Sequence, residues 1–289
     1  MPPFALALLS LDGVGRVTAW RLLEHFGSAE AVRRAPREQV LLRLKGVAHA
    51  DRTVDAVVSP DFDGALDRAR AQVDALAARR IAVLTPGSDH WPAGLMDLPR
   101  ADRPPVLYAF GDPKALGWPA LAVLAGAPLD PGPFEAVQDV ARRTLAQGRG
   151  LVVGASTGVD LALQKLSLAA EIPAVAVVGA GLARLAPAMR PGATALTRAG
   201  GLLVSPFDMA HGPFDHDERQ RALVQAALSR AVCAVAGPEG SPEDRAARWA
   251  AEAGRPLATV GPDGWASDWA PDALAVTAAT AGDVAGLVA

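Results

Sequence analysis

The sequence predicts an α/β fold: a Rossmann-like, mostly parallel sheet with helices on both faces, preceded by a small all-α domain. Three observations support this prediction. Strand-like and helix-like segments alternate from residue 81 onward. Several strand-like segments, such as 151–153 and 174–178, are continuous apolar runs, which are typical of parallel strands buried on both faces. Residues 1–58, by contrast, have the pattern of short helices separated by glycine turns.

The first 60 residues form the predicted helical domain. Residues 11–27 open with a Gly-x-Gly turn, continue with apolar side chains at helical spacing and end at Gly27, a typical helix stop. Residues 41–47 repeat the order of helix, glycine and valine. This pairing resembles a helix-hairpin-helix or SAM-like module, whose turn can offer N–H groups to a DNA phosphate. The alternative is that these glycines only allow tight turns between helices.

The rest of the chain divides into three predicted parts. An amphipathic helix within 61–80 connects the helical domain to a Rossmann-like domain over 81–262, and a short tail covers 263–289. The strands expected in the Rossmann-like domain are 81–85, 105–109, 120–125, 150–154, 174–178, 202–204, 231–236 and 256–260. Its expected helices are 134–147, 159–170, 216–229 and 242–253.

Composition excludes several classes of protein. No apolar run reaches the ~18 residues that span a bilayer, and the N-terminus lacks the basic segment of a signal peptide. Cys233 is the one cysteine, so the chain has neither an internal disulfide nor a multi-cysteine metal site. His211, Asp215, His216 and Asp217 follow no metal-ligand spacing, and we interpret them as a solvated loop. We therefore expect a cytoplasmic protein with no membrane segment, bound metal or cofactor.

Charge alone does not indicate a nucleic-acid partner. The net charge is −3 at pH 7, and the acidic excess lies in residues 231–289. A local basic groove is compatible with this balance, but the electrostatics of the whole chain give it no support.

Residues 91–111 carry the most specific pattern in the chain. They place a Trp-Pro dipeptide, a short apolar turn, a Pro-Pro pair and a Val-Leu-Tyr strand ahead of a Gly-Asp turn at Gly111. This order resembles the opening segment of the DNA-processing protein A family (DprA, also called Smf), and the resemblance extends from about residue 8 to residue 261. It implies a protein that binds single-stranded DNA, delivers it to the RecA recombinase during natural transformation or recombination, forms a homodimer and performs no covalent chemistry.

Site residues are expected in the strand-to-helix loops, because ligands of doubly wound sheets bind at the carboxyl ends of the strands. By the resemblance, the loop after 120–125 keeps Gly126 but has Ala127 or Pro128 where the family has an arginine that grips phosphate. Prolines here also remove N–H donors. The loop is therefore expected to bind phosphate poorly.

The loop over 153–160 preserves the family pattern best. Its glycines and Asp160 match, while Gln164 replaces a family histidine. Glycines allow a close approach of the backbone to a ligand, and the following helix start directs N–H groups toward an anion. Asp160 is interpreted as capping the helix or bracing the loop. The alternative for the glycines is a purely structural turn. The residues of this region expected to contact DNA are Gly154, Ser156, Thr157, Gly158 and Lys165.

Two further loops complete the predicted DNA site. Gly179 and Gly181 resemble a family glycine turn, and Arg184 follows them. Arg219 and Arg221 resemble the family's Arg-Asn-Arg and can grip adjacent phosphates at a helix start. Acidic neighbours compete for these guanidiniums, so an ion-pair network is an equal alternative, and a solvated surface is the default for Arg184.

Two other functions stay open. A phosphoribohydrolase of the LOG type needs a Pro-Gly-Gly-x-Gly-Thr loop with a nearby glutamate, which residues 238–243 match only faintly; release of a free base from a nucleotide would identify it. A diverged relative that serves as a protein-interaction scaffold is favoured by the missing loop arginine and the acidic C-terminal part. Such a scaffold would ignore DNA and retain a protein partner.

Overall fold

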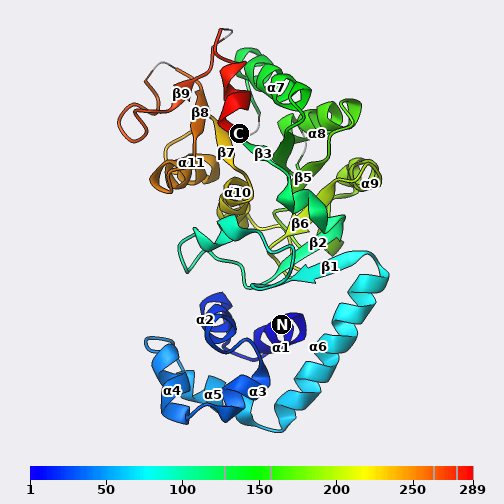
Figure 1. Ribbon diagram of the computed structural model, residues 1–289, viewed down its shortest axis with the longest axis vertical. Helices are drawn as coiled ribbons and strands as arrows, with labels where there is room; N and C mark the ends of the chain where they lie inside the picture. Colours follow the sequence, from blue (N-terminus) through cyan, green and yellow to red (C-terminus); the bar gives the residue numbers. More distant parts are fainter. Residues whose placement is uncertain (127, 157, 263, 278, 289) are drawn as a thin grey trace. The chain divides into compact units, whose positions relative to one another are not determined.

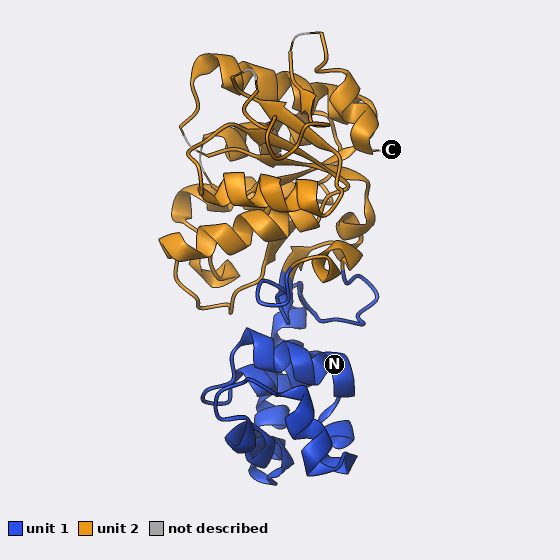
Figure 2. Ribbon diagram, turned by 90° about the vertical axis from the view of Figure 1, so that its left-hand side faces the viewer, with its two compact units in different colours: residues 1–91, 99–108 blue, residues 92–98, 109–289 orange. Residues whose placement is uncertain are grey.

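The computed structural model describes residues 1–126, 128–156, 158–262, 264–277 and 279–288. The chain forms two compact units, shown in different colours in Figure 2. Unit 1 comprises Met1–Trp91 and Pro99–Tyr108, and unit 2 comprises Pro92–Leu98 and Ala109–Ala289. The predicted fold class, an α/β Rossmann-like sheet after a helical region, is confirmed. The compact units are cut at different residues from the four predicted domains, whose boundaries as independent folding units stay a prediction.

Unit 1 is mainly helical and contains one short strand. Its elements are α1 Pro2–Leu9, α2 Arg16–Phe26, α3 Ala29–Arg34, α4 Arg37–Arg43, α5 Ala50–Val58, α6 Asp61–Ala78 and β1 Ile81–Leu84. The helix stop predicted at Gly27 is confirmed: its φ is 68° and its N–H donates to the carbonyl of Leu23. Ser28 then caps α3, because its hydroxyl accepts from the N–H of Ala31 at 3.2 Å. The long helix α6 packs on α1, with Phe62 edge-to-face on Phe4.

Unit 2 contains the parallel sheet (Figure 1). Strand β2, Leu107–Gly111, leads into it, and the following strands lie in the order β6-β5-β4-β3-β7-β8-β9, with parallel pairing. Their bounds are β3 Ala120–Leu124, β4 Gly150–Gly154, β5 Ala174–Val177, β6 Leu202–Ser205, β7 Ala231–Val235, β8 Leu257–Val260 and β9 Leu274–Ala275. The pairing places Leu121 beside Leu151 on one side and Ala231 on the other.

Helices cover both faces of this sheet. On one face lie α7 Pro131–Ala146, α8 Val159–Ala169 and α9 Arg190–Arg198, together with the short helix η6 Asp283–Val288. On the other face lie α10 Glu218–Ala227 and α11 Pro242–Glu252, which pack on each other and on the strands around β3 (Figure 1). Helix α9 and strand β9 were not predicted. The segment 263–289, expected as a tail, adds β9 to the sheet edge and buries Val284 and Val288 in the core.

Cys233 lies at the centre of β7 and is fully buried among apolar side chains. Burial raises the pKa of its thiol to about 12. A maleimide is therefore expected to leave the native protein unlabelled near pH 8, while the urea-unfolded chain, with an ordinary thiol pKa of about 8.5, is labelled quickly. Because the unfolded chain releases this proton first, the free energy of unfolding should also fall as the pH rises above ~8.5. Rapid labelling of the folded protein would contradict this burial.

Candidate functional site

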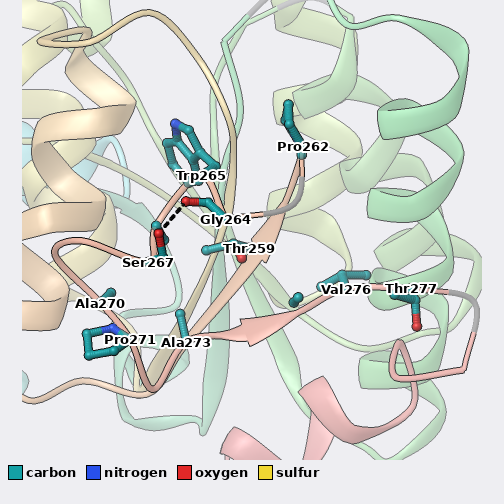
Figure 3. A pocket seen from close by; sticks show the side chains of 13 residues that line it. Thr259, Pro262, Gly264, Trp265, Ser267, Ala270, Pro271, Ala273, Val276 and Thr277 are labelled. Atoms are coloured by element: carbon teal, nitrogen blue, oxygen red, sulfur yellow. Dashed lines mark hydrogen bonds between the residues drawn. The ribbon is translucent and has the colours of Figure 1, made fainter.

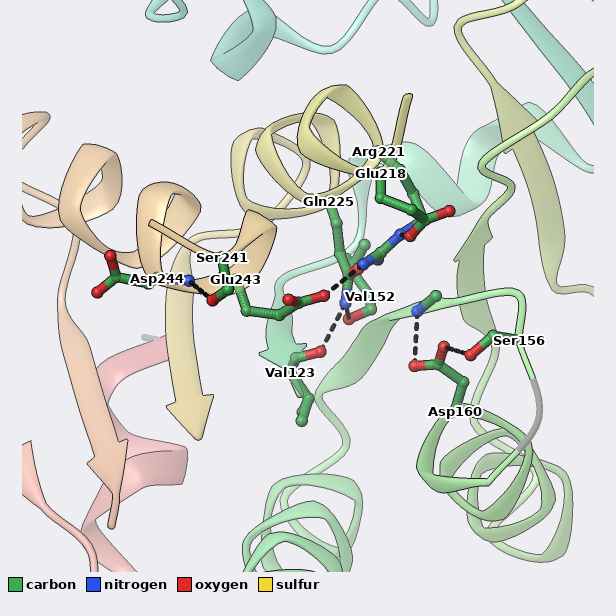
Figure 4. Close-up of polar contacts among 11 residues, drawn as sticks. Val123, Val152, Ser156, Asp160, Glu218, Arg221, Gln225, Ser241, Glu243 and Asp244 are labelled. Atoms are coloured by element: carbon green, nitrogen blue, oxygen red, sulfur yellow. Dashed lines mark hydrogen bonds and ion pairs between the residues drawn. The ribbon is translucent and has the colours of Figure 1, made fainter. Parts of the chain in front are cut away.

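The strand order reverses at β3. The chain leaves β3 through α7 to reach β4 on one side, and it returns much later to place β7 on the other side. In open α/β sheets, the crevice outside the carboxyl ends of the strands at such a reversal is the usual ligand site. The loops after β3, β4 and β7 converge there, as the sequence predicts, and the start of α10 contributes side chains to the same edge (Figure 4).

Arg221 is the centre of the polar contacts at this edge (Figure 4). It lies in the first turn of α10 with 8% of its surface exposed. Its Nε donates to Oε2 of Glu218 at 2.5 Å, its Nη2 donates to Oε1 of Glu243 at 2.8 Å, and its Nη1 donates to the amide oxygen of Gln225. We call these four residues the Arg221 cluster.

The Arg221 cluster holds more negative than positive charge. Burial lowers the pKa of the Arg221 guanidinium, but the carboxylates of Glu218, Asp160 and Glu243 raise it by more. Arg221 therefore stays protonated although it is buried. One guanidinium faces three carboxylates, so this part of the crevice, as it stands, favours a cation over a phosphate.

Gln225 connects the cluster to the sheet. Its Nε2 donates to the carbonyl oxygen of Val123 in β3 at 2.6 Å and to that of Val152 in β4 at 3.3 Å. Since its own oxygen accepts from Arg221, one buried amide joins α10 to the two strands beside the crevice. Sequence analysis did not identify Gln225, because its partners lie 102 and 73 residues away along the chain.

Glu243 was also missed, although the sequence holds a usable signal. Ser241 caps α11: its hydroxyl accepts from the N–H of Asp244 at 3.2 Å, and Pro242 occupies the first turn. A capped helix that follows β7 places its first-turn side chains at the carboxyl edge. Ser241-Pro-Glu-Asp therefore indicates that Glu243 lies at the crevice.

The loop after β4 is braced by its own side chains. Asp160 accepts from the N–H of Gly154 at 3.0 Å and from the hydroxyl of Ser156 at 2.6 Å, which confirms its interpretation as a bracing residue. A Cβ at Gly154 would lie 2.3 Å from Oδ2 of Asp160, so the glycine makes room for this carboxylate. Gly158 has a φ of 73°, which favours glycine. Lys165 is exposed on α8, and Thr157 lies outside the described residues.

Gly179 and Gly181 follow β5 and lie close to other parts of the protein. A Cβ at Gly179 would lie 2.2 Å from Oε1 of Glu218, and one at Gly181 would lie 2.1 Å from the carbonyl oxygen of Asp208. Arg184 is exposed, and its Nε donates to the carbonyl of Ala210 at 3.0 Å. The close approaches that these glycines permit are thus made to the protein itself. Phosphate contact through their N–H groups stays a prediction.

The two arginines of α10 differ in their surroundings. Arg219 is exposed, whereas Arg221 is buried in the ion-pair network that was the alternative in the sequence analysis. The pair therefore does not present two guanidiniums to the same solvent-facing surface. Gly126, after β3, is exposed, and a Cβ there would lie 3.8 Å from Oε2 of Glu243.

A small pocket lies at the carboxyl end of β8 (Figure 3). Its volume is about 150 Å³, and its walls come from Thr259, Trp265 and other uncharged residues up to Thr277. The Ser267 hydroxyl donates to the carbonyl of Gly264 at 2.8 Å inside it. Within the described ranges, no group of three or more His, Cys, Asp or Glu side chains is arranged to hold a metal ion. In the same part of the chain, no helix is long and apolar enough to cross a membrane.

Comparison with solved structures supports the fold. The X-ray structure of DNA processing protein A from Streptococcus pneumoniae superposes with a TM-score of 0.69 at 18% identity, covering 97% of this chain and 96% of that chain. DNA processing protein A from Helicobacter pylori, described for its single-stranded DNA binding mode, gives a TM-score of 0.52 at 21% identity, covering 63% of this chain and 81% of that one. No curated protein sequence matches the chain.

The sequence itself identifies the family. The family described as DNA recombination-mediator protein A matches residues 82–274, a range that contains the Arg221 cluster and the loops after β3, β4, β5 and β7. The chain therefore belongs to the DNA recombination-mediator protein A family.

Proposed function

We propose that this protein binds single-stranded DNA at the carboxyl edge of its sheet and delivers it to the RecA recombinase as a homodimer, without making or breaking a covalent bond. The observation that carries the proposal is the family match over residues 82–274, which includes the strand-to-helix loops of this edge. Arg184 lies in the loop after β5 and Arg219 at the start of α10, and both are exposed there. Lys165 is exposed on α8.

Binding of this kind depends on phosphates more than on bases. Exposed guanidinium and ammonium groups neutralise phosphates and release counterions, so affinity falls as salt rises. Phosphate contacts position the strand and carry no direct sequence information. We therefore expect the protein to bind strands of different sequence with similar affinity.

A second candidate is a protein-interaction scaffold that has lost DNA binding. The Arg221 cluster favours it, because one buried guanidinium already faces three carboxylates at the strand-order reversal. A phosphate that approached this crevice would meet those carboxylates first. The scaffold candidate therefore requires that the exposed cations elsewhere on the edge bind no DNA.

A salt titration of oligo-dT binding tests the two candidates. Each phosphate contact with a single strand contributes about −0.7 to the slope of log affinity against log salt. Arg219→Ala is therefore expected to weaken binding and to make that slope shallower by about 0.7. The matched control is Arg198→Ala, because Arg198 is equally exposed but ends α9 at the opposite edge of the sheet. An unchanged slope in Arg219→Ala would remove this arginine from the site.

Absence of binding at low salt in the wild-type protein would instead support the scaffold. If binding is present, transfer to RecA is measured separately, as a shorter lag before RecA hydrolyses ATP on the protein-coated strand. The homodimer is tested by light scattering of the purified chain.

A further inference from the structure

The loop between β6 and α10 carries four aromatic rings in contact. Phe207 stacks on His211 with centroids 4.9 Å apart and an interplanar angle of 8°. His211 meets Phe214 edge-to-face at 5.2 Å, and Phe214 stacks on His216 at 5.5 Å and 10°. We call these four residues the ring ladder. Its contacts have the offset-stacked and edge-to-face geometries that aromatic pairs prefer.

The inner end of the ring ladder is anchored in the fold. Phe207 is buried, and its N–H donates to the Ser205 hydroxyl at 3.1 Å, which itself donates to the carbonyl of Ala180 at 2.7 Å. Oδ2 of Asp217 lies 2.7 Å from Nε2 of His211, and its Oδ1 lies 3.5 Å from Nε2 of His216. One largely buried carboxylate thus orients both imidazoles, so the ladder is ordered before any ligand arrives.

The outer end of the ladder faces solvent. Phe214 is 49% exposed and the His216 side chain is 78% exposed. The Phe214 ring also lies close to Gly212, where a Cβ would be 3.3 Å from its Cζ. A half-exposed phenyl ring, held flat against an imidazole on an anchored loop, presents an ordered apolar face to water. Burial of such a face under another planar group is favourable.

We propose that Phe214 and His216 form a stacking site for an unpaired base of single-stranded DNA. This inference rests on the proposed function and adds to it the part of the site that contacts bases. The ladder ends directly before α10, where Arg219 is exposed in the first turn, so one short segment offers a stacking face and a cation. Alternating aromatic and basic groups are how proteins bind single strands without reading their sequence.

The local charge fits a base better than a phosphate. Asp208 and Asp215 are exposed on the same loop as the ring ladder, and they repel phosphates. Stacking, by contrast, needs only a flat face, and every base has one. The stacking site is therefore expected to contribute affinity that does not depend on salt, while the cations contribute the salt-dependent part.

Replacing Phe214 tests this inference. Phe214→Leu keeps an apolar side chain but removes the flat ring, and it is expected to weaken oligo-dT binding by about 5- to 100-fold with an unchanged salt slope. Phe214→Trp keeps a flat ring, so its binding is expected to equal or exceed that of the wild type. The added indole gives a direct signal as well, because a stacked base should quench its fluorescence. Circular dichroism checks that both variants fold.

Two controls separate stacking from other effects. Trp118→Ala removes an aromatic side chain of similar exposure, 44%, that lies before β3 at the amino edge of the sheet, and it is expected to leave binding unchanged. An abasic strand of equal length keeps the phosphates but lacks bases, so wild type and Phe214→Leu should bind it equally.

Failure of the inference and failure of the proposed function give different results. If the wild type binds oligo-dT and Phe214→Leu binds it equally well, the stacking site is wrong while DNA binding stands. A Phe214→Leu defect that persists on the abasic strand also overturns base stacking. If the wild type binds no DNA, the proposed function itself fails, and the exposed ring ladder is then left to a protein partner.

Discussion

Replacing Arg221 with alanine is expected to lower the free energy of unfolding by about 3–5 kcal/mol. The guanidinium is buried and donates to Glu218, Glu243 and Gln225. Its removal leaves the largely buried carboxylate of Glu243 without its cation, and it leaves the amide oxygen of Gln225 without this donor. An uncompensated charge in the interior costs far more than the loss of an exposed ion pair. Urea unfolding followed by circular dichroism measures the change.

The neighbouring Arg219→Ala is the matched control for stability. Arg219 lies two positions earlier in α10 and is exposed, so its replacement is expected to change the unfolding free energy by less than about 0.5 kcal/mol. Arg221→Lys is expected to fall between the two, because an ammonium keeps the charge but lacks the planar fork that reaches several partners. Equal stabilities of the Arg221→Ala and Arg219→Ala variants would show that the Arg221 cluster does not stabilise the fold.

Gly181→Ala is expected to destabilise the protein by about 1–3 kcal/mol, near the upper end of that range. The added Cβ would lie 2.1 Å from the carbonyl oxygen of Asp208 and 2.4 Å from that of Met209. Both are backbone atoms, so relief of the overlap requires the 208–211 segment to move. The N–H of Gly181, which donates to the carbonyl of His211 at 2.9 Å, would move with it. Thermal unfolding of the purified variant measures the loss.

Gly132→Ala provides the comparison for Gly181→Ala. Gly132 lies in the first turn of α7, and a Cβ there has no described atom within 4 Å. Alanine favours helix, so stability should stay constant or rise by less than about 1 kcal/mol. If both alanine variants are as stable as the wild type, the segment 208–211 is not packed against Gly181 as described.

Periodicity was sufficient to predict most of the sheet and its helices. The helix predicted over 159–170 is found at Val159–Ala169, and the strand predicted over 174–178 is found at Ala174–Val177. These segments have an apolar face or run long enough to be read locally. Helix α9 was missed because Pro191 and Gly192 in its first turn weaken the helical pattern. Strand β9 has two residues, too few for any period.

The contacts of the candidate site were harder to predict than its position. The topological rule placed ligands at the carboxyl edge, and the loops are there. However, Arg219 and Arg221 have nearly the same local sequence context, and only the packing of α10 on the sheet and α11 buries one of them. The partners of Arg221 come from Gln225 on the same helix and from Glu243 on the next one. Contacts between separate elements have no signature in the spacing of a single sequence.

The ring ladder shows the same limit. His211, Asp215, His216 and Asp217 were interpreted as a solvated loop, and Phe207 and Phe214 were not considered with them. The structure brings four of these side chains together through a turn whose form depends on Gly212 and Asp217. Irregular turns follow no period, so their ring contacts become visible only in three dimensions.

The burial of Cys233 makes the surface of this protein open to selective chemistry. The chain has a single thiol, and that thiol lies at the centre of β7 with a pKa of about 12. A cysteine introduced at position 214 or 219 would consequently be the only reactive one at neutral pH. A photocrosslinker or a paramagnetic probe attached there would report on a bound strand from one known position. No background mutation is needed, so the core that surrounds Cys233 stays intact in every labelled variant.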